Sequence, residues 1–337
     1  MKRIGLVVLI LCACFEPAAW GQQPGGTCSN DWTEFHRLDM ERWNRCETVL
    51  NVNNVGNLTL KWSYTIGKVV TSSPAVANGV VYVGSWDNNL YALNASTGAM
   101  LWSYATSGTV ESSPAVANGV VYVGSDDHNV YALNGSTGSK LWSYATGNRV
   151  ISSPTVANGV VYVGSGDHYV YALRADTGGK LWRYKTGFPV VSSPAVANGV
   201  VYVASWDNNV YALNASTGAL LWSFRTSDFV YSSPAVANGV VYIRSSDGNV
   251  YALSASTGAK LWSYHVDPPG AQSPSSPAVA NGVVYIGTNT LVYALNAGTG
   301  AKLWSYNPNG VFSSPAVANG VVYSVSTDGE VSAFGLK

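Results

Sequence analysis

The 337-residue sequence contains few charged side chains. Asp, Glu, Lys and Arg make up 11% of it, and 18 basic residues balance 18 acidic ones. A chain without a basic excess offers no electrostatic attraction for nucleic acid or for an anionic membrane surface. The longest apolar run, residues 4–15, is shorter than the roughly 20 residues that a membrane-spanning helix needs. The sequence therefore predicts no nucleic-acid partner and no transmembrane segment.

Cysteine is also scarce, and two of the four cysteines lie near the N-terminus. There Lys2-Arg3 precedes the apolar run and Ala19-Trp20-Gly21 follows it. This pattern is typical of a secretory signal peptide over residues 1–21. A lipoprotein signal, with a lipid anchor on Cys14, is the open alternative. Either predicts an exported protein, periplasmic or extracellular.

The other two cysteines, Cys28 and Cys46, lie in a lead-in segment over residues 22–57. In an oxidising compartment they are expected to form a disulfide. Such a bond would close a loop of roughly 18 residues and contribute about 3 kcal/mol in the chain-entropy model. Free thiols are the alternative, although neither cysteine belongs to a Cys-x-x-Cys pair of the kind that binds metals.

The sequence is dominated by a repeat. The block Ser-Ser-Pro-Ala-Val-Ala-Asn-Gly-Val-Val-Tyr, with small variations, begins at Ser72, Ser112, Ser152, Ser192, Ser232, Ser275 and Ser313. Asn-Gly between β-branched runs is a strong hairpin signal, because both residues tolerate positive φ. Each copy therefore predicts four short antiparallel strands that are apolar on both faces. Such units are buried only by packing against their neighbours.

Sheets of this kind, packed around an axis, form a β-propeller. We therefore predict an all-β fold, a seven-bladed β-propeller of four-stranded antiparallel blades over residues 58–337. One expected outer strand, Leu60 to Tyr64, precedes the first inner strand, and the last copy ends at Lys337 without an outer strand. The N-terminal strand is expected to join three C-terminal strands in the last blade, which closes the ring and leaves no unpaired inner edge.

The outer strands carry a second motif, Ala92-Leu-Asn-Ala-Ser-Thr-Gly-Ala-Met-Leu-Trp102, which occurs in six complete copies. It resembles the tryptophan-docking motif, Ala-x-Asp-x-x-Thr-Gly-x-x-x-Trp, of pyrroloquinoline-quinone-type (PQQ-like) propeller repeats. Asn94 replaces the motif's acidic residue, and its side chain can support the same turn. The resemblance covers nearly everything from residue 60 onward and implies that each tryptophan packs on the neighbouring blade. These structural tryptophans are Trp62, Trp102, Trp142, Trp182, Trp222, Trp262 and Trp304.

The resemblance leaves two classes of function open. Family enzymes of the quinoprotein dehydrogenase type are longer and hold PQQ with calcium on clustered Glu, Asn and Asp residues, which are not recognisable here. A PQQ- or metal-dependent oxidoreductase is therefore the alternative. The non-enzymatic outer-membrane assembly lipoproteins are further relatives and hold partner proteins. They favour a cofactor-free scaffold, expected to be a monomer, that binds an envelope protein or polysaccharide.

The copies differ mainly at the turn between the second and third strands and at the connections between blades. Both lie on the same face of a four-stranded meander, and a varied surface on a fixed scaffold is a candidate binding site. Aromatic side chains gather there: Trp86, Tyr169, Phe188, Trp206, Phe229, Tyr231 and Phe312. They are the predicted ligand contacts, with packing over neighbouring loops as the alternative.

The same turns carry imidazoles and carboxylates. His128 and His168 occupy matching positions beside Asp126, Asp127 and Asp167. Such a set could hold zinc or another divalent metal. An aspartate, however, recurs in six of the seven turns. We expect these aspartates to bond their own turn backbone, because six identical acids would have no chemical purpose in one reaction.

Overall fold

The computed structural model describes residues 62–268, 270, 275–307, 314–318, 321–325 and 331–334. The predicted signal peptide (residues 1–21), the lead-in segment (22–57) with Cys28 and Cys46, and Phe312 lie outside these residues. Every regular element in the described part is a β-strand. That part therefore offers no helix that could cross a membrane.

The strands form six antiparallel sheets of four strands and one sheet of three, which we number 1 to 7 in chain order. Their first strands are β1 (Ala75–Ala77), β5 (Ala115–Ala117), β9 (Thr155–Ala157), β13 (Ala195–Ala197), β17 (Ala235–Ala237), β21 (Ala278–Ala280) and β25 (Ala316–Ala318). The second strands are β2 (Val80–Gly84), β6 (Val120–Gly124), β10 (Val160–Gly164), β14 (Val200–Ala204), β18 (Val240–Arg244), β22 (Val283–Gly287) and β26 (Val321–Val325).

The third strands are β3 (Asn89–Asn94), β7 (Asn129–Asn134), β11 (Tyr169–Arg174), β15 (Asn209–Asn214), β19 (Asn249–Ser254), β23 (Val292–Asn296) and β27 (Val331–Phe334). The fourth strands are β4 (Met100–Ala105), β8 (Lys140–Ala145), β12 (Lys180–Lys185), β16 (Leu220–Arg225), β20 (Lys260–His265) and β24 (Lys302–Tyr306). The predicted all-β class and the four-stranded antiparallel sheets are thereby confirmed.

The Asn-Gly pair joins the first two strands of a sheet as predicted. In sheet 1, Asn78 and Gly79 have φ values of 51° and 76°, the two positive values that a type I′ hairpin turn requires. Ala77 and Val80 pair directly across this turn. The same pair of positive φ values recurs in sheets 2 to 6.

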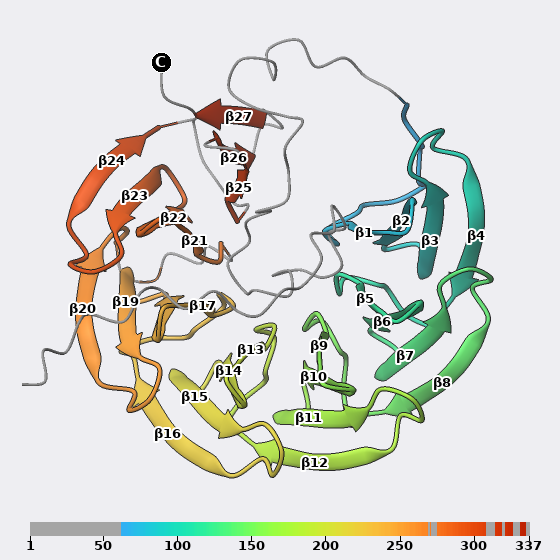
Figure 1. The fold of residues 1–337 in the computed structure, drawn as a ribbon, viewed down its shortest axis with the longest axis horizontal. Helices are drawn as coiled ribbons and strands as arrows, with labels where there is room; N and C mark the ends of the chain where they lie inside the picture. Colours follow the sequence, from blue (N-terminus) through green and yellow to red (C-terminus); the bar gives the residue numbers. More distant parts are fainter. Residues whose placement is uncertain are drawn as a thin grey trace, which may run out of the picture.

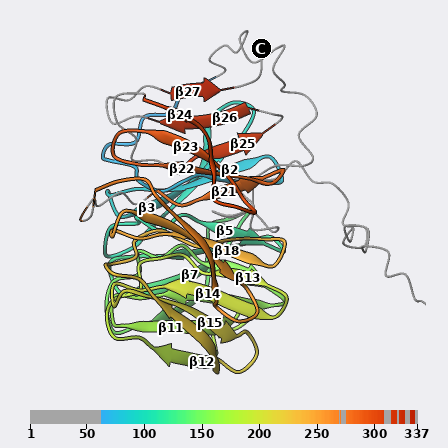
Figure 2. The same ribbon diagram turned by 90° about the vertical axis from the view of Figure 1, so that its left-hand side faces the viewer.

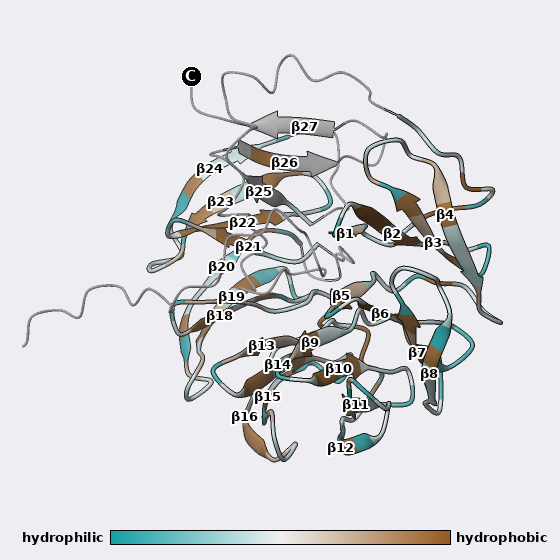
Figure 3. Cartoon of the chain, turned by 45° about the vertical axis from the view of Figure 1, so that its right-hand side comes forward, coloured by the Kyte–Doolittle hydropathy of each residue, from teal (hydrophilic) through white to brown (hydrophobic). Residues whose placement is uncertain are grey.

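The sheets stand around a common axis, with the first strands innermost and the fourth strands outermost (Figure 1). Seen from the side, the strands of sheet 7 lie at one end of the molecule, and β11, β12 and β15 lie at the opposite end (Figure 2). Apolar residues dominate the second and third strands, whereas β8 and β12 carry hydrophilic ones (Figure 3). Buried clusters join adjacent sheets: Leu90 of sheet 1 and Tyr131 of sheet 2 belong to the same one. The core therefore lies between the sheets.

The outer strands are fastened to the next sheet by tryptophan. Trp102 of β4 donates a hydrogen bond from Nε1 to the carbonyl oxygen of Gly135, at 2.9 Å. Its ring covers Gly138, where an added Cβ would lie 2.7 Å from the indole. Glycine is needed there for space and for its φ of 72°. The same indole bond is made by Trp62, Trp142, Trp182, Trp222 and Trp262.

The inner ends of the sheets are joined by serine. The backbone N–H of the second serine in each Ser-Ser-Pro donates to the hydroxyl of its counterpart in the next sheet. The chain of bonds runs Ser73, Ser113, Ser153, Ser193, Ser233, Ser276 and Ser314, with distances of 2.9 to 3.0 Å. A hydroxyl can accept this bond and still donate elsewhere. Consecutive sheets are thus held at both the inner and the outer end.

The segment expected to close the ring is described only from Trp62 onward, and residues 62–66 form no strand. Trp62 nevertheless docks on sheet 1 like the other tryptophans, with Nε1 2.9 Å from the carbonyl oxygen of Ala95. The ring of Tyr64 lies 6.2 Å from that of Tyr91. The segment thus takes the place of an outer strand against sheet 1, while sheet 7 shows three strands.

We expect Gly138→Ala and Gly98→Ala to destabilise the protein about equally, because each added Cβ would enter an indole, that of Trp102 or Trp62. Gly79→Ala is the matched control, since Gly79 has a similar φ of 76° and open space around it. Gly79→Ala should lower the free energy of unfolding only by the amount needed to hold an alanine at positive φ, about 1–2 kcal/mol. Gly138→Ala and Gly98→Ala should lower the free energy of unfolding by a further ~1–3 kcal/mol, because the added methyl group overpacks the junction. Urea unfolding measures all three, and equal losses for all three would contradict the docking.

Candidate functional site

The second-to-third turns and the connections between sheets are hydrogen-bonded to each other. The backbone N–H of Trp206, in the turn of sheet 4, donates to the carbonyl oxygen of Pro189 at 3.1 Å. In sheet 2, the hydroxyl of Thr109 donates to Asp126 Oδ2 at 2.8 Å. We call the surface that these segments form the variable face. It comprises residues 67–71, 86–89, 106–111, 126–129, 146–151, 166–169, 186–191, 206–209, 226–231 and 246–249.

Four turn aspartates each hold their own turn and link two sheets. Asp127 Oδ1 accepts the backbone N–H of Asn129 at 3.0 Å, and Oδ2 accepts the hydroxyl of Tyr131 at 2.7 Å. Oδ2 also accepts the N–H of Ser107, in the connection from sheet 1, at 2.9 Å. The first role was expected from the sequence, whereas the link between sheets was not. Asp167, Asp207 and Asp247 make equivalent bonds.

In sheet 2 these bonds lower the pKa of the Asp127 carboxyl group. Burial raises the pKa of Asp127, but the bonds from Tyr131, Ser107 and Asn129 outweigh it and leave the pKa below its ordinary value. Burial and the bond to Asp127 in turn raise the pKa of Tyr131 far above its ordinary value. At neutral pH the carboxylate is therefore charged and the phenol protonated, which suits a structural link better than proton transfer.

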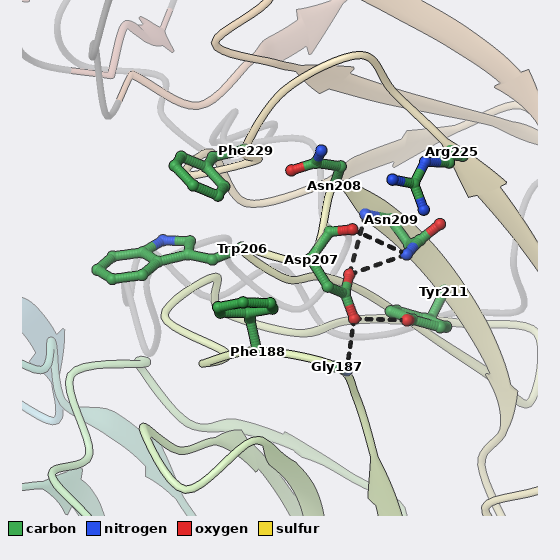
Figure 4. A pocket seen from close by; sticks show the side chains of 9 residues that line it. All are labelled: Gly187, Phe188, Trp206, Asp207, Asn208, Asn209, Tyr211, Arg225 and Phe229. Carbon is green, nitrogen blue, oxygen red and sulfur yellow. Dashed lines mark hydrogen bonds between the residues drawn. The ribbon is translucent and has the colours of Figure 1, made fainter.

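Four of the predicted ligand contacts come together beside sheet 4. The ring of Trp206 lies 5.1 Å from that of Tyr231 and 6.5 Å from that of Phe229. Phe188 and Phe229 lie on either side of Trp206 (Figure 4). Phe188, Trp206 and Phe229 border a pocket of about 390 Å³, within the size range of small-molecule sites. Its lining residues are Gly187, Phe188, Trp206, Asp207, Asn208, Asn209, Tyr211, Arg225 and Phe229.

The other predicted aromatic contacts lie apart from this pocket. Trp86 belongs to sheet 1, where its Nε1 donates to the hydroxyl of Thr71 at 3.0 Å. Tyr169 of sheet 3 lies 5.9 Å from Tyr171, ring to ring, and the guanidinium of Arg183 stands 4.4 Å from its ring centroid. The sequence located these residues on one face, but it could not show which of them share a pocket.

The pocket also presents polar groups. Trp206 Nε1 and Asn208 Oδ1 are shielded from solvent and have no hydrogen-bond partner among the described residues. Arg225, at the end of β16, is exposed, and no described residue forms an ion pair with it. By contrast, Asp207 accepts bonds from Gly187, Tyr211 and Asn209 (Figure 4). The pocket thus offers exposed aromatic faces and a cation, and one unpaired donor and one unpaired acceptor lie shielded beside it.

The predicted metal ligands are not brought together as a metal site. His128 and His168 have φ values of 74° and 73° and occupy the left-handed position of their turns. The ring of His168 stacks on Phe188 at 6.0 Å, while Asp127 and Asp167 serve the links between sheets. Within the part of the chain that the structure describes, no three His, Cys, Asp or Glu side chains form a group that could hold a metal ion.

A buried ion pair in sheet 5 was not predicted from the sequence. Arg244 Nη2 lies 2.6 Å from Asp267 Oδ2, and the two side chains are 1% and 2% exposed. Burial lowers the pKa of Arg244, while Asp267 and Asp247 act in the opposite direction. In sheet 1 the equivalent residue is Gly84, where an added Cβ would lie 2.5 Å from Val110.

Two signals in the sequence could have revealed this pair. The first is an arginine at a position that holds glycine in sheets 1, 2, 3 and 6. The second is the longer connection that follows, since linked serines are 43 residues apart here and 40 apart in earlier sheets. Asp267 lies at the start of this longer connection.

Comparisons with known proteins identify one matching family and solved structures with a similar fold. A family model described as outer membrane protein assembly factor BamB matches residues 47–189 and 166–337. No curated protein matches the sequence. The solved structure of BamB from Moraxella catarrhalis has a TM-score of 0.74 at 23% identity, covering 82% of this chain and 88% of that one. A europium-containing methanol dehydrogenase has a TM-score of 0.77 at 16% identity, covering 91% of this chain and 85% of that one. At these identities the two structures show a shared fold.

The bond between Tyr131 and Asp127 predicts a pH-dependent loss of stability. Tyr131→Phe should lower the free energy of unfolding at pH 7 by about 1.5–3 kcal/mol, because the bond has a charged acceptor. The bond lowers the folded-state pKa of Asp127. Its contribution is therefore complete above the unfolded-state pKa of about 3.9 and is lost as pH falls through the folded-state value.

Urea unfolding at pH 7 and near pH 3 measures the difference in the free energy of unfolding between wild type and Tyr131→Phe. This difference should be smaller at the lower pH. The control is Tyr104→Phe, since the ring of Tyr104 lies 5.6 Å from that of Tyr131 but its hydroxyl has no hydrogen-bond partner among the described residues. Its effect should stay within about 0.5 kcal/mol. A difference between Tyr131→Phe and wild type that is independent of pH would contradict the assignment.

Proposed function

The chain belongs to the family of the outer membrane protein assembly factor BamB, and on that premise we propose an exported, non-catalytic propeller that binds a protein or polysaccharide partner on its variable face. The observation that carries the proposal is the group of exposed aromatic side chains at one pocket. Phe188 and Phe229 are 54% and 40% exposed beside Trp206. Aromatic residues without a core role are frequent anchors of binding surfaces. The protein acts as a monomer in the periplasm or outside the cell.

The proposal includes a closed seven-bladed ring, completed by the segment that contains Trp62. Its support is the docking of that residue, because Trp62 makes the indole bond and covers Gly98 as the other tryptophans cover their glycines. The serine bonds also reach Ser314, next to the first strand of sheet 7. The Gly98→Ala variant bears on this closure: a loss no larger than that of Gly79→Ala would remove its support.

The methanol dehydrogenase neighbour supplies the alternative, a PQQ- or metal-dependent oxidoreductase. A hard metal ion of this kind is bound mainly by oxygen ligands, and the described residues contain no cluster of three or more His, Cys, Asp or Glu side chains. The carboxylates of PQQ would need converging cations, whereas the pocket contains one, Arg225. The described residues thus give the oxidoreductase less support than the binding scaffold, and we assign no catalytic step to it.

A capture experiment tests the proposed binding face. Wild-type protein and a Trp206→Ala, Phe229→Ala double variant are immobilised and exposed to envelope extract. The double variant should retain at most about a tenth of the captured partner, because aromatic anchors dominate binding energy. The control is Ser136→Ala with Ser216→Ala, two exposed residues in the turns between third and fourth strands, away from the variable face. Equal capture by wild type and both variants would refute the proposal, provided that their unfolding midpoints agree.

A further inference from the structure

The pocket of sheet 4 has features that its counterpart in sheet 1 lacks. The turns of both sheets read Trp-Asp-Asn-Asn. In sheet 1, however, the residues equivalent to Phe188, Phe229 and Arg225 are Lys68, Thr109 and Ala105. Because the two sheets share the same strands and turns, the binding properties of the sheet 4 pocket depend on these three side chains. We infer that it binds an acidic sugar unit of a polysaccharide, with the sugar carboxylate at Arg225. This inference rests on the proposed binding role of the variable face.

The aromatic side chains suit a sugar ring. Phe188 and Phe229 flank Trp206 (Figure 4), and all three line the same pocket. The two phenylalanines are about half exposed in the free protein, so a ligand that covers them removes apolar surface from water. A pyranose offers flat C–H faces for this purpose and hydroxyl groups around its edge.

The unpaired polar atoms indicate a hydroxyl-bearing ligand. In sheet 1 the indole N–H of Trp86 is satisfied by the hydroxyl of Thr71. In sheet 4 the equivalent residue is Val191, which has no hydroxyl, and Trp206 Nε1 remains without a partner, as does Asn208 Oδ1. Shielded donors and acceptors of this kind are costly to leave unpaired.

A hydroxyl both donates and accepts, so neighbouring hydroxyls of one sugar can satisfy the indole N–H of Trp206 and the amide oxygen of Asn208. Both atoms are shielded in the free protein, so a ligand reaches them only after a neighbouring side chain of the pocket moves aside. Changes of side-chain rotamer on this scale are common at binding surfaces.

The charges indicate an acidic sugar. Arg225 ends β16 opposite Asn209, and Lys185 occupies the equivalent position in sheet 3, opposite Tyr169. Sheets 1, 2 and 5 have Ala105, Ala145 and His265 at this position. The carboxylate of Asp207, which also lines the pocket, already accepts hydrogen bonds from Gly187, Asn209 and Tyr211. Two exposed cations on neighbouring sheets suit a polymer with a carboxylate on successive units.

An acidic peptide is the competing ligand, and the observations favour the sugar. Aspartate and glutamate side chains accept hydrogen bonds but do not donate them when ionised. They could reach Arg225 and the indole N–H of Trp206, but only a backbone N–H of the peptide, whose position is set by the main chain, could then donate to Asn208 Oδ1. A uronic acid supplies the carboxylate, the acceptor and the donor from one ring.

Titration calorimetry with a panel of hexuronate oligosaccharides (galacturonate, mannuronate and glucuronate) tests the inference on the full-length mature protein. Each is compared with its carboxyl-reduced, neutral counterpart. At least one acidic oligosaccharide should bind about tenfold more tightly than its neutral form. Arg225→Gln should abolish that preference, Arg225→Lys should keep part of it, and Trp206→Ala should weaken binding of both forms. Lys140→Gln, which removes an exposed cation of β8, is the charge control and should change neither.

Several outcomes would overturn the inference. One is the same affinity for acidic and neutral forms, and another is an acidic preference that survives Arg225→Gln. Binding of poly-glutamate with the same dependence on Arg225, without binding of any uronate, would assign the pocket to peptide. If no uronate binds while the capture experiment still depends on Trp206 and Phe229, the inference fails and the proposed function stands.

Discussion

The seating of an indole over a glycine is the contact on which the rest of the structure depends. Each sheet is apolar on both faces, so it is stable only when a neighbour covers each face at the right distance. Trp102 covers Gly138 closely enough that even a methyl group would collide with it. The bond from Ser73 to Ser113 at the inner end and that from Ser107 to Asp127 on the variable face fix the same junction at two further points. Three short contacts, repeated from sheet to sheet, therefore set the spacing of the ring.

These contacts also explain where the chain is free to vary. They use backbone atoms, one glycine and a few side chains, and they occupy the aspartate of each turn but not the residue before it. That preceding residue, Trp206 in sheet 4, can therefore change without loosening a junction. The residues around it in the adjoining connections are equally unconstrained, and Phe188 and Phe229 are found there. The buried pair of Arg244 and Asp267 is a different kind of departure, since it replaces close packing against a glycine by an ion pair.

Local signals in the sequence were sufficient to predict the antiparallel sheets. The positive φ values at Asn78 and Gly79 follow from chemistry within two residues, and the repeat itself indicates how units stack. The pocket was less predictable, because residues far apart in the sequence meet there. Trp86 and Trp206 occupy identical turns, yet only Trp206 has aromatic neighbours from both connections. Matching positions likewise suggested that His128 and His168 could share a metal, but their turns use the left-handed backbone of each histidine and keep the acids engaged.

The central claim is that the ring is a fixed scaffold and that a few departures in one sheet create the binding site. The most direct measurement transfers those departures to sheet 1 through Lys68→Phe, Thr71→Val, Ala105→Arg and Thr109→Phe, and counts bound acidic oligosaccharide by calorimetry. We expect the variant to keep the unfolding midpoint of the native chain to within a few degrees and to bind twice as many ligand molecules per chain. A folded variant that binds no more than the native chain would contradict the claim, because the same residues on the same scaffold would then not suffice.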